Sequence, residues 1–220
     1  VVSGKQTGGR GRRGRSFFSP KGTGIYLSFI FSPDMKDFNP GEVTCRAAVA
    51  ACLAIEACLD VKPKIKWVND IYVDDRKVAG ILTEARVDFE TGVPTRVVVG
   101  IGFNVYVPEG GFPEELSQVA VALTDTKSFN LRARIGAEFI SLFRKFTDSQ
   151  DKEFVLSKYR ERSFLEGKEI MVLSGDDKRP AVAGGIGDDF SLEVTYENKE
   201  TERLTAGEVS IVPKKGNVTK

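Results

Sequence analysis

Runs of hydrophobic and alternating residues predict a chain that is rich in β-strands. Residues 24–31 (GIYLSFIF) form a nearly continuous run of aromatic and branched residues, which is typical of a buried strand. Residues 64–68 alternate between polar and apolar side chains, as a half-buried strand does. The segments 71–73 and 77–84 flank an acidic turn and predict a hairpin. Residues 95–104 (TRVVVGIGFN) predict a further strand.

Helical patterns lie between and after these strands. Asn39-Pro40-Gly41 interrupts the chain, and the alanine-rich residues 43–59 predict a helix that packs closely on a sheet. Shorter helices are expected near 113–122 and 151–162. Residues 130–148 predict a helix whose apolar side chains share one face, namely Ile135, Phe139, Leu142, Phe143 and Phe146.

The pattern changes at about Leu165, where short strands separated by glycine, aspartate and asparagine turns begin. Five such strands in about 50 residues favour a small β-barrel that packs on the first part of the chain. We therefore expect one domain over residues 1–162 and a second over residues 163–220. The predicted strands of the second domain cover residues 169–173, 181–186, 190–196, 202–204 and 209–212.

Composition indicates an ordinary soluble globular protein. The chain has 220 residues, of which 41% are hydrophobic and 29% charged, and this argues against disorder. No apolar run approaches the ~18–20 residues that a membrane helix needs, and no signal-peptide core is seen. In a helix, Cys45 and Cys52 would stand about 10 Å apart, beyond disulfide reach. Together with Cys58 they are expected to be small buried thiols, so we expect a cytoplasmic protein.

The chain contains no histidine, which excludes Ser-His-Asp and Cys-His catalysis, histidine bases and histidine-ligated metals. Chemistry must then use carboxylates, lysine, arginine, backbone amides or a bound cation. The charge is also uneven, because residues 1–33 carry six lysines and arginines and no acid, while the whole chain is only +1. A cationic patch on a mildly acidic body favours a specific anionic ligand.

The patch centres on residues 9–15, GRGRRGR. Alternating glycine and arginine exposes backbone N–H groups beside guanidinium forks, which suits phosphate or carboxylate. Alone, such a string is more often an RNA-binding segment or a basic tail. Here Phe17-Phe18 and a regular strand follow directly, and the string does not repeat, which favours a loop within a fold.

A second signal is KWVND at residues 66–70. A lysine on a half-buried strand, beside a tryptophan and before Asn-Asp, is unusual, although an exposed lysine next to a core tryptophan is the default for either residue singly. Asp70 is a candidate for orienting Lys66 or a metal, and a turn-stabilising role is equally consistent with the sequence.

These motifs resemble the catalytic region of biotin protein ligases, the biotin–[acetyl-CoA-carboxylase] ligases. They occur in the family's order and spacing, and the likeness covers nearly the whole chain. The matching residues are Gln6, the run 9–15, Phe17-Phe18-Ser19-Pro20, residues 66–70, residues 76–82 with Glu84, and residues 100–105.

The resemblance implies an α/β (α+β) fold in which a mixed sheet with flanking helices, as in class II aminoacyl-tRNA synthetases, precedes a small SH3-like β-barrel. The implied enzyme is a biotin–[biotin carboxyl-carrier protein] ligase. It converts biotin and MgATP into biotinyl-5′-AMP and pyrophosphate. A lysine of a biotin carboxyl carrier domain, of acetyl-CoA carboxylase or a related carboxylase, then takes the biotin as an amide.

The resemblance also implies roles for particular residues. Gln6 would bond the ureido region of biotin. Arg10, Gly11 and Arg12 would belong to the loop that closes over biotin and its adenylate. Lys66 would meet the biotin carboxylate and the α-phosphate, which makes Lys66 and Arg12 the expected catalytic residues. No residue is expected to be a dedicated metal ligand.

The resemblance also implies that Asn104, at the end of the predicted strand 95–104, lies near the adenine. Gly100 and Gly102 weaken a strand, so their expected use is to let a flat ring or a neighbouring backbone come close. Phe17 could wall an apolar pocket, and Trp67 is expected to be core.

The sequence also departs from the family pattern. A Ser/Thr-Asn element that helps hold the ureido group has no counterpart before Val1, so we expect the chain to be a fragment that lacks about 30–40 residues. This puts the activity of the chain as written in question. Phe17 stands where tryptophan is usual, and Val68 replaces a usual proline. No DNA-binding helix-turn-helix precedes the catalytic part, and no DNA or membrane partner is expected.

Other functions stay open at the level of sequence. They are a lipoate ligase, a nucleic-acid-binding module built on residues 5–15, and a noncatalytic binder of biotin. A homodimer is also open, since the strand near residues 76–81 could be an edge that pairs two copies.

Overall fold

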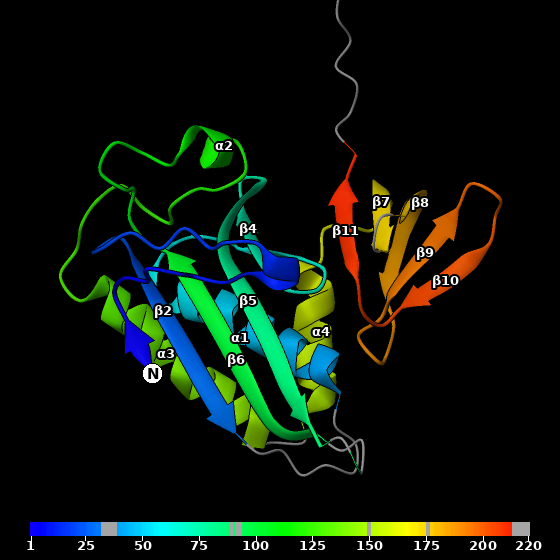
Figure 1. Cartoon of the computed structure of the whole chain (residues 1–220), viewed down its shortest axis with the longest axis horizontal. Coiled ribbons are helices and arrows are strands. Elements are labelled where there is room, and N and C mark those ends of the chain that lie inside the picture. Colours follow the sequence, from blue (N-terminus) through cyan, green and yellow to red (C-terminus); the bar gives the residue numbers. More distant parts are fainter. Residues whose placement is uncertain (32–38, 89, 91–93, 149–150, 175–176, 213–220) are drawn as a thin grey trace, which may run out of the picture.

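The computed structural model describes residues 1–31, 39–88, 90, 94–148, 151–174 and 177–212. Within them the chain forms two β-sheets with helices packed mainly on the first (Figure 1). The first sheet has strand order β1-β2-β6-β5-β4-β3. Its strands are β1 Val2–Ser3, β2 Gly24–Phe31, β3 Lys64–Lys66, β4 Asp70–Val73, β5 Arg76–Val87 and β6 Pro94–Asn104.

The α/β fold class is confirmed, but the expectation of a mixed sheet is wrong for the described strands. Every pair of neighbouring strands in the first sheet is antiparallel. Strands β4, β5 and β6 follow one another along the chain, and such neighbours favour antiparallel pairing. The helical crossover from β2 leads to β3 at the far edge, so the two strands that it joins never pair.

Strand β5 is not an edge, so residues 76–81 do not offer the open strand edge that the sequence left open for pairing two copies. The strand lies between β4 and β6. At Lys77 the β5 backbone also bonds to the segment after α2. The Lys77 N–H donates to Val119 O at 2.9 Å, and the Lys77 carbonyl accepts from Val121 N at 3.0 Å.

These bonds explain why the helix expected near 113–122 is much shorter. Helix α2 covers only Glu114–Ser117, since the residues that follow bond along β5 instead of continuing the helix. The remaining helices agree with prediction to within a few residues: α1 is Pro40–Cys58, α3 is Leu131–Asp148 and α4 is Lys152–Arg162. No helix in the described part of the chain is long and apolar enough to cross a membrane.

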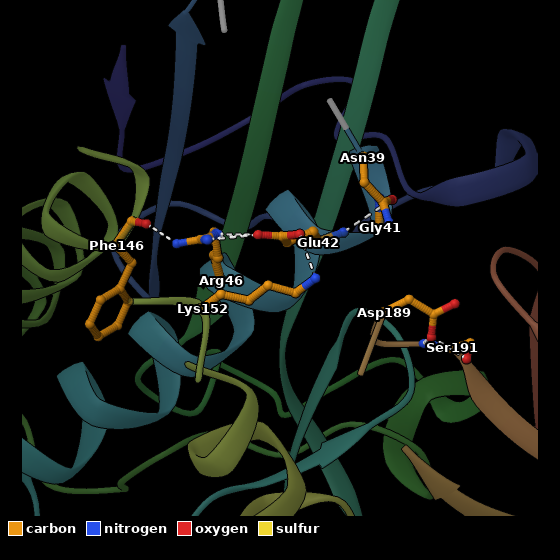
Figure 2. A network of polar contacts seen from close by, with 8 residues as sticks. All are labelled: Asn39, Gly41, Glu42, Arg46, Phe146, Lys152, Asp189 and Ser191. Atoms are coloured by element: carbon orange, nitrogen blue, oxygen red, sulfur yellow. Dashed lines mark hydrogen bonds and ion pairs between the residues drawn. The ribbon is translucent and has the colours of Figure 1, made fainter. Parts of the chain in front are cut away.

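Helix α1 begins three residues before the predicted start because of its cap. Asn39 Oδ1 accepts from Gly41 N at 2.8 Å and from Glu42 N at 3.4 Å, and proline stands at the first helical position. Glu42 in turn forms ion pairs with Arg46 at 2.6 Å and with Lys152 at 3.8 Å (Figure 2). The helix start is therefore bound to both its own next turn and α4.

The helices cover one face of the first sheet. Along β2 and β6 the odd-numbered residues point toward the helices and are largely buried, as Ile25, Leu27 and Phe103 are. Phe103 and Phe29 pack edge-on against Phe139 of α3, with both ring centroids 5.7 Å away. The even-numbered residues of β2, β6, β5 and β4 consequently face the other side of the sheet.

The second sheet has strand order β10-β9-β8-β7-β11 with antiparallel pairing throughout. This agrees with the small SH3-like unit that was expected. Strand β9 begins two residues later than predicted, because Phe190 lies in a turn with φ of 64°. The strands are β7 Glu169–Ser174, β8 Asp177–Ile186, β9 Leu192–Tyr196, β10 Thr201–Leu204 and β11 Glu208–Ile211.

Phe190 joins the two sheets. Its carbonyl accepts from Trp67 Nε1 at 2.9 Å, and its ring meets that of Tyr159 at 5.9 Å in a T-shaped contact. Tyr159 also donates to Val68 O at 3.2 Å. The chain just after β3 is thus fixed against the second sheet.

Candidate active site

One row of residues crosses the first sheet on the face away from the helices. The cross-strand partners run, in order, Ser3, Tyr26, Gly102, Gly80, Asp70 and Lys66. Side chains on adjacent strands at matched positions stand side by side. The row therefore has a polar edge at β1, a flat middle without side chains, and a charged edge at β3 and β4.

Above this row lies a cavity of about 610 Å³. Its walls come from the sheet, from the loop at residues 8–18, from the segment after α2, and from β11 of the second sheet. The structure brings every predicted site residue to this cavity: Gln6, Arg10, Gly11, Arg12, Lys66, Gly100, Gly102 and Asn104. Their roles there stay predictions.

The glycines of the row make room for a ring of the chain itself. A Cβ on Gly102 would lie 2.6 Å from Phe17 Cε1, and one on Gly80 would lie 2.8 Å from Lys77 Cε. At Gly100 the nearest atom would be 3.7 Å away. Phe17 thus lies flat on the sheet as a floor of the cavity, while Gly100 leaves ordinary space. Trp67 touches the cavity but is 3% exposed, in line with the expected core role.

The arginine-glycine loop, residues 9–17, is a folded hairpin. Gly11 N donates to Arg15 O at 2.7 Å and Phe17 N donates to Gly9 O at 2.9 Å, closing a short 3₁₀ turn η1 at Arg12–Gly14. Gly9 is required, since a Cβ there would lie 2.4 Å from Phe17 O. Figure 1 shows the loop crossing the front of the sheet toward β11.

Arg12 lines the cavity and bonds to two other segments of the chain. Its guanidinium donates to Asn69 Oδ1 at 3.1 Å and to Gly207 O at 2.5 Å. Burial lowers the pKa of Arg12, and the nearby Asp70 and Glu208 oppose that shift. A half-buried guanidinium held by two neutral oxygens keeps its charge available for an anionic ligand.

Two lysines share the charged edge of the row. Burial lowers the pKa of Lys66, which lies with its Nζ 5.9 Å from the centre of the Tyr72 ring. Lys77 Nζ forms an ion pair with Asp70 at 2.6 Å and lies 5.9 Å from the centre of the Phe17 ring. Asp70 is therefore paired with Lys77 rather than with Lys66.

The remaining predicted residues lie at the ends of the strands. Gln6 Nε2 donates to Ser19 Oγ at 3.1 Å, which ties the first loop to the segment after the hairpin. Asn104, at the end of β6, is 9% exposed, and its Nδ2 donates to Lys77 O at 3.5 Å. Both side chains present polar groups at the rim of an otherwise flat, apolar floor.

Sequence reasoning missed Lys77 and Glu208. Lys77 lies in the family-like motif at residues 76–82, but only the fold shows that its side chain forms an ion pair with Asp70. Glu208 of β11 lines the cavity and lies far along the chain from every other site residue. Among the described residues, no group of three or more acidic or cysteine side chains is placed to hold a metal ion.

The chain is similar to known biotin ligases in sequence. Residues 1–104 match the biotin/lipoate A/B protein ligase family. The bifunctional ligase/repressor BirA of Bacillus spizizenii is 38% identical over 146 residues, which is 66% of this chain and 44% of that protein. The biotin–[acetyl-CoA-carboxylase] ligase of Mycobacterium tuberculosis is 26% identical over 95% of this chain and 77% of that protein. The chain spans less than half the length of the Bacillus relative.

Solved structures show the same fold. The biotin protein ligase of Aquifex aeolicus, in complex with biotin and ATP, superposes with a TM-score of 0.76 at 25% identity. The match covers 96% of this chain and 87% of the Aquifex chain, so it extends through both sheets.

Proposed function

We propose that this chain is an ATP-dependent biotin protein ligase, because its residues 1–104 match the biotin/lipoate A/B protein ligase family. Its substrates are biotin and ATP, and its products biotinyl-5′-AMP and pyrophosphate. A lysine of a biotin carboxyl carrier domain, such as that of acetyl-CoA carboxylase, then attacks the adenylate. The amide forms, and AMP and a proton leave.

One observation carries this proposal: Arg12, Lys66 and Lys77 line one cavity, whose floor is formed by glycines of the sheet and the ring of Phe17 and suits the compact apolar rings of biotin. A biotin carboxylate is already a nucleophile, so attack on the α-phosphate needs no base. It needs neutralised charge on the phosphate oxygens and aligned reactants. Fixed positive groups supply both, and this accords with a chain that lacks histidine.

Each positive group has a distinct place in this scheme. Lys66 and Arg12 stabilise the charge that develops on the α-phosphate, and Arg10 and Gly11 form the cover of the same loop. Lys77 lines the same cavity, and its proposed role is that of a second lysine beside the reacting carboxylate. Asp70 holds Lys77 at 2.6 Å and leaves Lys66 for the ligand.

The other predicted residues are proposed to contact the two ends of the bound adenylate and the sheet surface beneath it. Gln6 bonds the ureido group, and Asn104 lies near the adenine. Gly100 and Gly102 keep the floor flat, although Phe17 fills the space above Gly102. Phe17 then supplies the apolar surface for the thiophane ring and tail.

Mg²⁺ fits this site through the phosphates of ATP. The acids at the cavity are already paired: Asp70 with Lys77, Glu84 with Arg10 at 3.4 Å, and Glu208 with Arg15. Mg²⁺ is commonly held by substrate phosphates, waters and one or two carboxylates rather than by a protein cage. Asp70 would be the carboxylate to join it, because it lies between Lys66 and Gly80 in the row of cross-strand partners. The ion supplies further neutralisation of phosphate charge.

Lipoate is the second candidate substrate, because the family match covers both biotin and lipoate ligases. A nucleic-acid-binding role is disfavoured, since the loop is a closed hairpin in which three arginines form ion pairs with acidic side chains.

A competition binding experiment distinguishes biotin, lipoate and nucleic acid as ligands. Biotin should displace a labelled biotinyl-adenylate analogue far better than lipoate, and RNA or DNA should have no effect at physiological salt. Lipoate displacing as well as biotin, or steeply salt-dependent RNA binding, would overturn the proposal.

We also propose a domain boundary, a cellular location and a test of the oligomeric state. We place the domain boundary between residues 162 and 163, where α4 ends at Arg162. A cytoplasmic location is supported by the three free cysteines. A homodimer remains to be tested by sedimentation, and it would use a surface other than residues 76–81.

A further inference from the structure

Glu208 stands apart from the other acids of the site because it belongs to the second sheet. It begins β11, pairs across the sheet with Leu173, and lines the cavity. Its side chain is only 16% exposed. The catalytic roles proposed above make no use of it.

The arginine-glycine loop contacts this region through several groups. Arg15 Nη1 lies 2.5 Å and Arg13 Nη1 3.8 Å from the Glu208 carboxylate. Arg13 Nη2 also donates to Leu173 O at 3.1 Å, and Arg12 donates to Gly207 O. Three arginines of one loop, at positions 12, 13 and 15, are thus bound to residues of or next to the neighbouring strands β7 and β11 of the second sheet.

The other end of the loop is held weakly. Arg10 meets Glu84 of β5 at 3.4 Å, but the two side chains are 75% and 48% exposed. Exposed ion pairs of this kind contribute little. Because Glu208 is nearly buried and binds two arginines, it is the stronger attachment.

The distribution of charge has a consequence for the ligand. Glu208 neutralises Arg13 and Arg15, whereas among the described contacts Arg12 has only neutral acceptors. The two paired arginines therefore anchor the loop, and Arg12, which lines the cavity, has no acidic side chain bonded to it among the described contacts.

We propose that Glu208 is a positioning residue, which holds the arginine-glycine loop over the cavity through Arg13 and Arg15 and so places Arg12 against the ligand. The proposal rests on the proposed function for the identity of that ligand. The second sheet thereby forms a wall of the site and limits escape of the adenylate.

The first test needs no substrate. Hydrogen exchange of the Gly11 and Arg15 amides, which close the η1 turn, is measured in the full-length protein and in Glu208→Gln. Exchange should rise about ten-fold, the factor that one hydrogen bond to a charged group is worth. The matched control is Glu193→Gln, which breaks a surface ion pair with Arg203 on the same sheet. Glu208→Asp, which keeps the carboxylate, should restore most of the protection.

A double-variant cycle tests whether Glu208 acts through the arginine. Arg15→Gln alone should also raise exchange, and Glu208→Gln combined with Arg15→Gln should go little further than either change alone. Additive effects, or equal exchange in Glu208→Gln and Glu193→Gln, would overturn the proposal.

A functional readout separates positioning from general stability. In Glu208→Gln the bound biotinyl-adenylate should dissociate about ten-fold faster, while the urea midpoint matches that of Glu193→Gln. Unchanged dissociation would contradict the role in the site. Should the wild type fail to bind biotin while the loop still loosens in Glu208→Gln, the proposed function fails and the attachment of the loop stands.

Discussion

Gly102 shows how a single missing side chain shapes the site. Phe17 Cε1 would lie 2.6 Å from a Cβ at this position, and the strand backbone on either side cannot withdraw. The phenyl ring lies flat on the sheet because nothing stands beneath it.

Gly102→Ala is therefore expected to displace Phe17, to destabilise the fold by about 1–3 kcal/mol as overpacking does, and to weaken biotin binding. Urea unfolding and calorimetry measure the two effects. Gly185→Ala, at a position with no atom within 4 Å of the added carbon, should change neither. Normal biotin affinity in Gly102→Ala would show that the floor is not part of the ligand site.

Lys66 illustrates a residue kept at a cost to stability. Its pKa is lowered by burial, with Lys77 and Arg15 acting in the same direction and Asp70 and Glu208 opposing. Between the lowered value and the ordinary 10.5, the unfolded chain binds more protons than the folded chain. The contribution of Lys66 to the free energy of unfolding therefore rises with pH between its lowered pKa and 10.5. Below the lowered pKa the charged lysine destabilises the fold.

Lys66→Met should accordingly stabilise the protein at pH 7, by up to about 1 kcal/mol, and the gain should shrink as the pH approaches 10.5. Urea unfolding at both pH values measures it. Lys64→Met, on the exposed outer end of the same strand, is the control. A variant that is less stable than wild type at pH 7 would contradict this account.

At the residue scale, the site residues were predictable because the motifs at residues 9–15, 66–70 and 100–105 resemble those of biotin protein ligases, and all of the predicted residues line the cavity. The sequence could not predict Lys77 and Glu208. The reach of Lys77 depends on a register shift between β4 and β5 at Ile71/Tyr72, and Glu208 depends on how the second sheet docks.

Helices and strands were largely predictable because each has its own period and end signals. The predictions of helices and strands are wrong where hydrogen bonds to distant residues replace the helix that the local sequence favours. Residues 119–121 bond to Lys77 instead of extending α2. Strand β5 lies between β4 and β6, so it is not the edge that the sequence left open as a surface for pairing two copies.

The cap of α1 is an element whose contribution can be measured alone. Asn39→Ala removes two hydrogen bonds to the first turn and should cost about 1 kcal/mol of unfolding free energy. Asn39→Ser, which retains a capping oxygen, should recover most of the loss. Equal stability of Asn39→Ala and wild type would mean that the network of Glu42, Arg46 and Lys152 in Figure 2 holds the helix start without the cap.

At the scale of the whole molecule, the two sheets act as one unit through Phe190. This side chain is 2% exposed and packs on Tyr159, while its carbonyl holds Trp67 next to Lys66. The sequence placed both sheets correctly but contained no local sign of this contact, which joins residues more than a hundred positions apart.

Phe190→Ala should destabilise the protein by about 3–5 kcal/mol, as for other buried phenylalanines, and loosen the segment after β3. Calorimetric unfolding should show one transition in the wild type. Phe129→Ala, at a side chain that is 90% exposed, is the matched control and should be neutral. A loss confined to the second sheet, with Trp67 unaffected, would argue against a shared unit.

The central claim is that fixed positive groups in one cavity turn a carboxylic acid into an acyl-adenylate. Exchange of labelled pyrophosphate into ATP by the full-length protein tests it most directly. Exchange should require biotin and should fall about 10²–10³-fold in Lys66→Ala, or about 3–4 kcal/mol, as for loss of one preorganised charge-stabilising group. It should be unchanged in Lys64→Ala. Exchange that proceeds equally without biotin, or at the full rate in Lys66→Ala, would contradict the account.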